Sequence, residues 1–209
     1  MNRFRMEHLV REVRVVPRTP EYHWYEIDLD RRHVPAPATA TCVIGATRRS
    51  DVTAVCQRLT GDEAITHVQF EATAAEAAGQ CAVIRSTGRE PIPAVHLARP
   101  PESPDELHKC AMRLTEFGTS IIKIVYPCPS QRQLRAGLDL LERWPAGLPG
   151  LSLTPDGGRQ ARVAAALAGS RLVYAPGQAS RERMSASWYR RLLIEGGSDP
   201  GVATWTTND

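Results

Sequence analysis

Hydrophobic and polar positions in the second half of the chain predict helices separated by short strands. Ser103-Pro104-Asp105-Glu106 has the features of a helix start, and apolar residues follow at helical spacing as far as Gly118. Further helices are expected over 130–144, 160–168 and 181–194. Short apolar runs predict strands over 120–126, 150–154 and 170–175. This alternation indicates parallel β-α units.

The first half has strand-like runs with less room between them. These runs cover 12–16, 23–29, 40–47, 65–72, 81–86 and 93–98. Residues 52–59 and 73–79 leave space for about two turns of helix each, and 31–40 contains two prolines. We therefore expect one α/β domain over 1–195, a degenerate (β/α)8 TIM-type barrel whose N-terminal helices are shortened or missing, followed by a flexible tail over 196–209. A doubly wound open sheet is the alternative, although no GxGxxG motif follows an early strand.

Composition and charge exclude several classes of protein. The net charge is +3, and the 26 basic and 23 acidic residues are interspersed along the chain. Aromatic residues make up only 6% of the chain. We therefore expect no nucleic-acid partner. No apolar run approaches the length of about 18 residues that a membrane span needs. The N-terminus is charged and lacks a secretory signal, and the five cysteines are widely spaced without a CxxC motif. We expect a cytoplasmic protein with no membrane partner, no disulfide scaffold, no metal and no cofactor.

Lys123 is the strongest candidate for chemistry. Of the 26 basic residues 24 are arginine, and the two lysines are Lys109 and Lys123. Lys123 lies inside an apolar strand, where it shares one face with Ile121 and Val125. Burial disfavours an ammonium group, and a neutral amine can add to a carbonyl to form a Schiff base. The alternative interpretation is a buried lysine paired with a carboxylate.

His96 ends the strand that precedes Lys123. Catalytic groups of β/α barrels lie at the carboxyl ends of strands, and histidine is the usual general acid and base near neutral pH. Because one helix separates the two strands, we expect both side chains to reach one substrate. A hydrogen-bonded structural histidine is the alternative.

Two later loops offer binding groups. The PDGGR turn at 155–159 opens a helix, and Arg159 or Arg162 there has the fork geometry that binds a carboxylate or phosphate. Gln178 lies in a turn after the last predicted strand. The histidines form no HxH or HExxH pattern, which argues against a metal site.

The stretch PAVHLARPPESPDELHKCAMRLTEFGTSIIKIVYP (93–127) resembles the central part of type I 3-dehydroquinate dehydratases. In that family a histidine ends one strand and a Schiff-base lysine lies on the next, and His96 and Lys123 match them without a gap. Arg162 resembles the arginine that holds the substrate carboxylate. The APGQ sequence at 175–178 is similar to the family's S-A-P-G-Q loop, so Gln178 corresponds to the glutamine that contacts the substrate. The resemblance covers about residues 91–194.

The first half departs from the family pattern. The family's E-W-R-x-D strand reads W-Y-E-I-D over 24–28, so Glu26 replaces the substrate-contacting arginine. Arg48 resembles the arginine of the family's T-F-R sequence, whereas the glutamate that supports the histidine has no counterpart near Val52. Tyr174 replaces the serine of S-A-P-G-Q. These differences favour a substrate related to 3-dehydroquinate.

The resemblance implies a Schiff-base lyase that dehydrates a cyclic hydroxy-keto acid in a shikimate pathway-like biosynthetic step. Lys123 would form the iminium and His96 would act as base and then as acid. The implied substrate-binding residues are Arg162, Gln178, Arg48 and Tyr174. Two alternatives stay open: another reaction at Lys123, such as aldol cleavage or isomerisation, or a non-catalytic barrel that binds a small acid or a partner protein. Trimmed helices would leave apolar sheet surface exposed, and a second copy of the chain in a homodimer is its simplest cover.

Overall fold

Eight parallel strands form the sheet of the computed structural model, which describes residues 8–13, 24–30, 42–48, 51–73 and 75–175, together with Trp188. The strands are β1 (His8–Val13), β2 (Trp24–Asp28), β3 (Cys42–Thr47), β4 (His67–Glu71), β5 (Glu90–His96), β6 (Ile121–Pro127), β7 (Gly150–Asp156) and β8 (Leu172–Ala175). Their order in the sheet is β7-β6-β5-β4-β3-β2-β1-β8, so the first strand pairs with the last.

The remaining seam, between β7 and β8, is joined by hydrogen bonds at the base of the two strands. The Arg171 N–H donates to the Leu151 carbonyl over 2.8 Å. The Leu153 N–H donates to the buried hydroxyl of Ser170 over 2.9 Å. With β1 paired to β8, these contacts complete the closed (β/α)8-type sheet that the sequence predicts, in preference to an open one.

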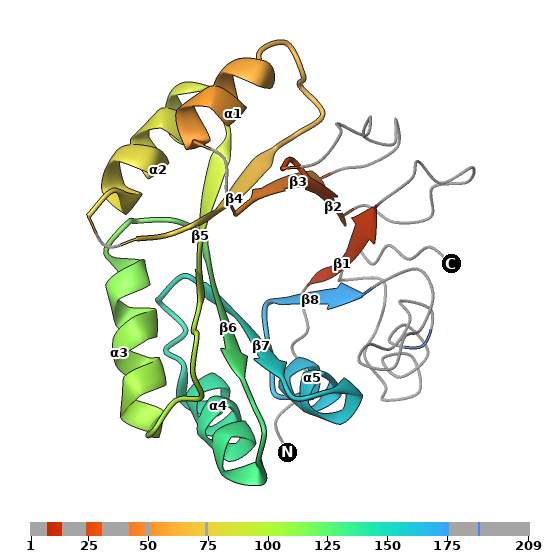
Figure 1. Cartoon of the computed structure of the whole chain (residues 1–209), viewed down its shortest axis with the longest axis vertical. Coiled ribbons are helices and arrows are strands. Elements are labelled where there is room, and N and C mark those ends of the chain that lie inside the picture. Colours follow the sequence, from red (N-terminus) through yellow and green to blue (C-terminus); the bar gives the residue numbers. More distant parts are fainter. Residues whose placement is uncertain are drawn as a thin grey trace.

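In the ranges that the structure describes, five helices lie on the outer side of the strands (Figure 1). They are α1 (Val52–Arg58), α2 (Ala77–Ser86), α3 (Pro104–Thr115), α4 (Gln131–Arg143) and α5 (Arg159–Leu167), and each follows one of the strands β3 to β7. The first two are shorter than α3 and α4, as the sequence predicts, but α2 begins and ends later than the predicted 73–79. Residues 14–23 after β1, 31–41 after β2 and 176–187 after β8 lie outside the described residues, and so do the rest of the predicted helix over 181–194 and the tail. No helix in the described ranges is long and apolar enough to cross a membrane.

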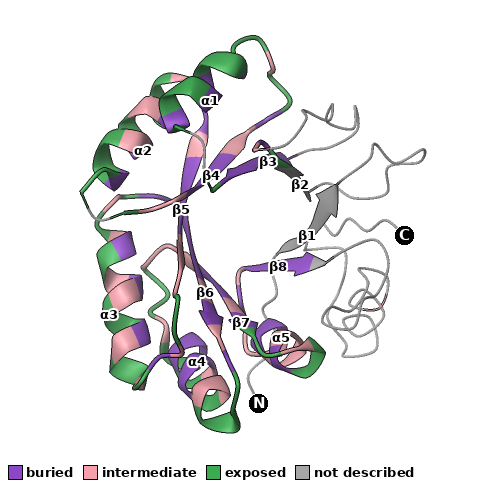
Figure 2. Cartoon of the chain, in the orientation of Figure 1, coloured by how far each residue is buried: buried purple, intermediate pink, exposed green. Residues whose placement is uncertain are grey.

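The buried side chains form an inner and an outer layer. One cluster contains only strand residues, among them Ile44, Ile92 and Ile121, and therefore fills the barrel interior. The outer clusters combine strand residues with the inward faces of the helices, which Figure 2 shows as buried. Ile122 and Ile124 belong to this outer layer, which confirms that the neighbours of Lys123 on β6 alternate between the two faces.

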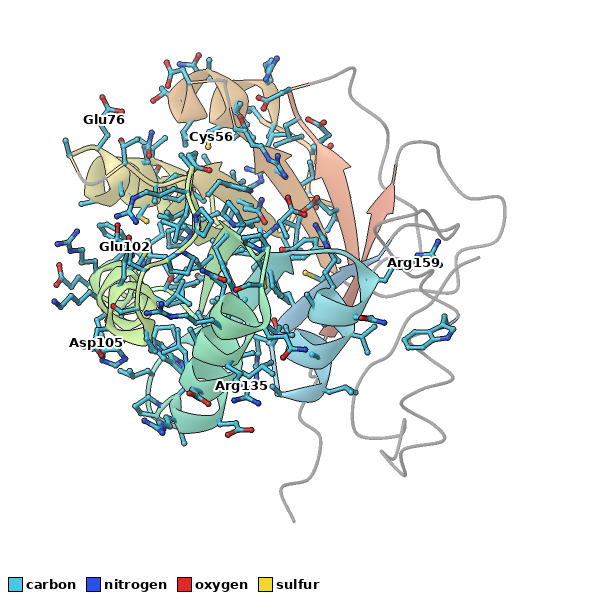
Figure 3. The ribbon with its side chains drawn as sticks, turned by 60° about the horizontal axis from the view of Figure 1, so that its bottom comes forward. Cys56, Glu76, Glu102, Asp105, Arg135 and Arg159 are labelled. Carbon is cyan, nitrogen blue, oxygen red and sulfur yellow. The ribbon has the colours of Figure 1, made fainter. Side chains whose placement is uncertain are left out.

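The exposed faces of the helices carry the charged residues. Figure 3 shows Glu76 of α2 and Asp105 of α3 extending away from the strands. Both side chains are exposed, while Leu107, Ala111 and Leu114 of α3 are buried at helical spacing. The Ser103 hydroxyl accepts a hydrogen bond from the Glu106 N–H, so the predicted start of α3 is confirmed.

The prediction of a strand over 81–86 is wrong, because these residues form the second half of α2. Short apolar runs do not distinguish a strand from a buried helix. Ala77, Cys81 and Ile84 recur at helical spacing and are the buried positions of α2, so burial of one helical face decides the outcome. The first strand also begins earlier than predicted, at His8.

Candidate active site

Lys123 belongs to a polar layer inside the barrel, which we call the lysine layer. Its members come one each from β2, β4, β6 and β8, the alternation typical of barrel interiors, and they are Glu26, Gln69, Lys123 and Tyr174. Lys123 is 4% exposed. Its side chain points into the barrel interior, because Lys123 lies on the inner face of β6.

Within the described part of the chain, three side chains lie around the Lys123 nitrogen. Nζ donates a hydrogen bond to Gln69 Oε1 over 2.8 Å and lies 3.4 Å from the centre of the Tyr174 ring. Glu26 Oε2 lies 3.8 Å from the same nitrogen, and its side chain is 14% exposed. The Tyr174 hydroxyl donates to Gln69 Oε1 over 3.0 Å. The burial predicted for Lys123 is present, but its surroundings are polar rather than wholly apolar, because opposite strands supply side chains that the sequence of β6 does not reveal.

His96 occupies the carboxyl end of β5 on the same inner face. Lys123 pairs in register with Ala94, and His96 lies two residues further along, beside Val125. Two residues of a strand span about 7 Å, so the imidazole lies above the amine toward the mouth of the barrel. The register therefore brings together the two residues that the sequence analysis selects.

Glu71, at the end of β4, fixes the orientation of His96. Its Oε2 lies 2.5 Å from His96 Nδ1, and its Oε1 accepts the His96 backbone N–H over 2.9 Å. A carboxylate on Nδ1 favours the tautomer in which Nδ1 carries the proton and Nε2 has a free lone pair. His96 Nε2 is buried and has no hydrogen-bond partner among the side chains that the structure describes. This nitrogen is therefore the one available to a ligand.

The carboxyl group of Glu71 is held in its ionised form. Burial raises its pKa, but the hydrogen bonds from the His96 ring and backbone, with the positive charges of His96 and Arg48, outweigh burial and lower the pKa below the ordinary value of 4.5. Glu71 therefore stays negative and can stabilise a protonated imidazole next to it.

Replacing Glu71 by glutamine will remove part of the acid sensitivity of the fold. Because the pKa of Glu71 is lower in the folded state, its contribution to stability is complete above the ordinary value and is lost as the pH falls through the folded value. Urea unfolding between pH 7 and pH 3 should show the wild type losing stability relative to Glu71→Gln below about pH 4.5. Glu63→Gln, at an exposed position, is the control. If the free energy of unfolding fell with pH in the same way for wild type and Glu71→Gln, the predicted contribution of Glu71 to acid sensitivity would be contradicted.

Arg48 and Arg162 are less closely joined to this centre. Arg48 is exposed at the end of β3; its backbone N–H donates to Asp30 Oδ2 over 2.6 Å, and its charge acts on Glu71. Arg162 of α5 is 17% exposed and donates through Nη2 to Asp156 Oδ1 over 3.1 Å. Gln178 lies outside the described residues.

Sequence reasoning missed Gln69 and Glu71. Both lie on one face of the strand predicted over 65–72, where they alternate with the buried Val68 and Phe70. Polar residues at alternate positions of a strand with buried neighbours are a signal that they line the interior. Within the described part of the chain, no group of three or more histidine, cysteine, aspartate or glutamate residues is placed to hold a metal ion.

Comparisons with known proteins identify the fold. No family model and no curated protein matches the chain. Among solved structures, a type I 3-dehydroquinate dehydratase from Clostridium difficile, with covalently modified comenic acid, is similar with a TM-score of 0.68 at 10% identity, covering 93% of this chain and 94% of that one. The 3-dehydroquinate dehydratase from Aquifex aeolicus VF5 gives a TM-score of 0.66 at 11% identity, covering 90% of this chain and 98% of that one.

The same barrel also occurs in a different enzyme. The carboxyl transferase domain of Rhizobium etli pyruvate carboxylase, with pyruvate and biocytin, gives a TM-score of 0.60 at 16% identity, covering 78% of this chain and 32% of that one. A fold shared by two chemistries does not select a reaction, so function must come from the site. By its structure, this chain has the β/α-barrel fold of the type I 3-dehydroquinate dehydratases.

Proposed function

We propose that this protein is a Schiff-base-forming lyase that dehydrates a cyclic hydroxy-keto acid, either 3-dehydroquinate or a related compound. The observation that carries the proposal is the placement of Lys123 and His96 on the inner faces of adjacent strands, with Glu71 holding the imidazole. The amine and the base are the two groups that such an elimination needs. The match of both residues to the family's catalytic pair, without a gap, supports the same assignment.

The reaction begins at Lys123. Its neutral amine adds to the ketone carbon of the substrate, and loss of the carbonyl oxygen as water leaves an iminium. The iminium withdraws electrons and makes the neighbouring C–H acidic. His96 Nε2 removes that proton, and the resulting enamine expels the β-hydroxyl group, which leaves as water with the proton from His96. Hydrolysis of the iminium releases the unsaturated ketone and restores Lys123.

Glu71 is a positioning residue for this proton transfer. It binds the Nδ1 side of the ring, so that Nε2 faces the substrate, and its charge stabilises the imidazolium that forms. General acid and base assistance of this kind contributes about 10²–10⁴-fold to the rate.

The binding groups are assigned by their charge and by the resemblance. Arg162 would hold the substrate carboxylate, Gln178 would close over the ligand, and Arg48 would add positive charge beside Glu71. Tyr174 contacts the lysine directly, so its ring would stack beside the iminium. Because Glu26 occupies the barrel position of a family arginine, a relative of 3-dehydroquinate fits better than 3-dehydroquinate itself. A cytoplasmic homodimer in a biosynthetic pathway completes the proposal, and aldol cleavage or isomerisation at Lys123 is the alternative reaction.

A non-catalytic barrel is the second candidate, and one observation favours it. The Lys123 nitrogen has a carboxylate, an amide oxygen and an aromatic face around it, which is how a purely structural buried lysine is stabilised. In that case the mouth near His96 and Arg48 would bind a small acid without turnover.

Borohydride reduction separates these candidates. The protein is incubated with 3-dehydroquinate, with other cyclic keto acids and with pyruvate, reduced, digested and analysed by mass spectrometry. An adduct on Lys123 with a cyclic keto acid, accompanied by release of water to give an enone that absorbs in the ultraviolet, supports the dehydratase. An adduct accompanied by a carbon fragment indicates an aldolase. Binding of keto acids without any adduct would overturn the enzyme in favour of the non-catalytic barrel.

A further inference from the structure

Glu26 is the carboxylate of the lysine layer, and its place beside Lys123 has consequences for the chemistry of that amine. It reaches the barrel interior from β2, with Oε2 3.8 Å from Lys123 Nζ. An opposite charge at this distance, largely shielded from water, favours the charged form of a lysine. The remaining contacts act in the same direction, because an amide oxygen and an aromatic face both stabilise a cation.

Among the side chains that the structure describes, the other groups around Lys123 do not supply a competing charge. The residues in register with it on β5 and β7 are Ala94 and Ser152. Tyr174 on β8 is bound through its hydroxyl to Gln69 on β4. Glu71 and His96 lie at the carboxyl ends of their strands and are bound to each other. Among the described side chains, Glu26 is thus the charged group in contact with the amine.

We infer that Glu26 sets the protonation state of Lys123 and holds it as an ammonium in the resting protein. The catalytic role of this contact rests on the proposed function. An ammonium has no lone pair, so it must lose one proton before it can attack a ketone. Glu26 is therefore a positioning residue that controls when the nucleophile becomes available. Net iminium formation consumes the ammonium and the ketone and releases one water, because the proton that the ammonium loses before attack ends on the carbonyl oxygen, which leaves as that water.

The same carboxylate restricts what lies beside the amine. A ligand group facing β2 would approach a negative charge that is 14% exposed. A substrate carboxylate there would be repelled, whereas a hydroxyl group could donate a hydrogen bond to Glu26. The acid group of the substrate must therefore point away from β2, toward Arg162 of α5, and the hydroxyl-bearing part toward β2.

Lysine NMR tests the inference without relying on catalysis. The chain has two lysines, so protein grown with [ε-13C]lysine gives two signals, and Lys109→Arg assigns them. Lys109 is exposed on α3 and serves as an internal reference. In Glu26→Gln the titration midpoint of Lys123 should move to lower pH by about one unit or more, and Glu26→Asp should remain near the wild type. Superimposable Lys123 titrations in wild type and Glu26→Gln would overturn the inference.

Two further measurements keep the test decisive. If Glu26→Gln does not fold, Glu26→Ser removes the same charge and carries the same comparison. Cyanoborohydride trapping of pyruvate across the pH range should show Glu26→Gln forming the Lys123 adduct at lower pH than the wild type, and identical profiles would count against the inference. Absence of trapping in every variant would defeat the proposed enzyme while leaving the NMR result valid.

Discussion

Lys123→Arg will abolish covalent trapping of keto acids while retaining a positive charge within the lysine layer. Arginine stays protonated and does not form a Schiff base under these conditions, so the reaction loses its nucleophile. Turnover should fall to the background of the assay. The measurement is intact-protein mass after borohydride reduction, with peptide mapping of any adduct.

Lys109→Arg is the matched control, because it removes the other lysine of the chain from an exposed helix position. This variant should trap keto acids like the wild type. Lys123→Met tests the effect on stability, because it leaves the Glu26 carboxylate without the ammonium beside it. Removing one partner of a buried ion pair lowers the free energy of unfolding by about 3–5 kcal/mol. An adduct that persists in folded Lys123→Arg would show that the reactive group lies elsewhere.

His96→Gln will slow dehydration by about 10²–10⁴-fold while leaving adduct formation at Lys123 detectable. The glutamine keeps a polar side chain at the end of β5 but has no group that can accept a proton near neutral pH. Two rates are compared: turnover of the keto acid, and exchange of its α-hydrogen with deuterium while it is bound as the iminium, before any reduction. Both should decrease together, since both depend on removal of the same proton.

Two further variants serve as comparisons for His96→Gln. Glu71→Gln should lower the rate less than His96→Gln and should change its pH profile, because the carboxylate orients the ring without touching substrate. His108→Gln alters an exposed histidine on α3 and should leave the rate unchanged. If His96→Gln retained turnover within a few-fold of wild type, the assignment of His96 as the general base would be wrong.

The second half of the chain was largely predictable. The helix start at Ser103, the strand around Lys123 and the following strand-helix units agree with the sequence patterns. These elements are determined by local features, namely caps, glycine stops and periodic apolar residues, which act over one or two turns. The strand predicted over 81–86 failed for the opposite reason, because only packing against neighbouring elements shows which face of a short apolar run is buried.

By itself the sequence predicted that Lys123 lies within a buried parallel strand, on one face with Ile121 and Val125, and that His96 ends the preceding strand. Only the tertiary structure showed that Glu71 binds His96 from 25 residues away and that Gln69 binds Lys123 from 54 residues away. The physical reason is that alternation along one strand decides which face a side chain occupies, whereas closure of the barrel decides which strands face each other. The polar partners of Lys123 and His96 therefore came from strands whose positions no local pattern specifies.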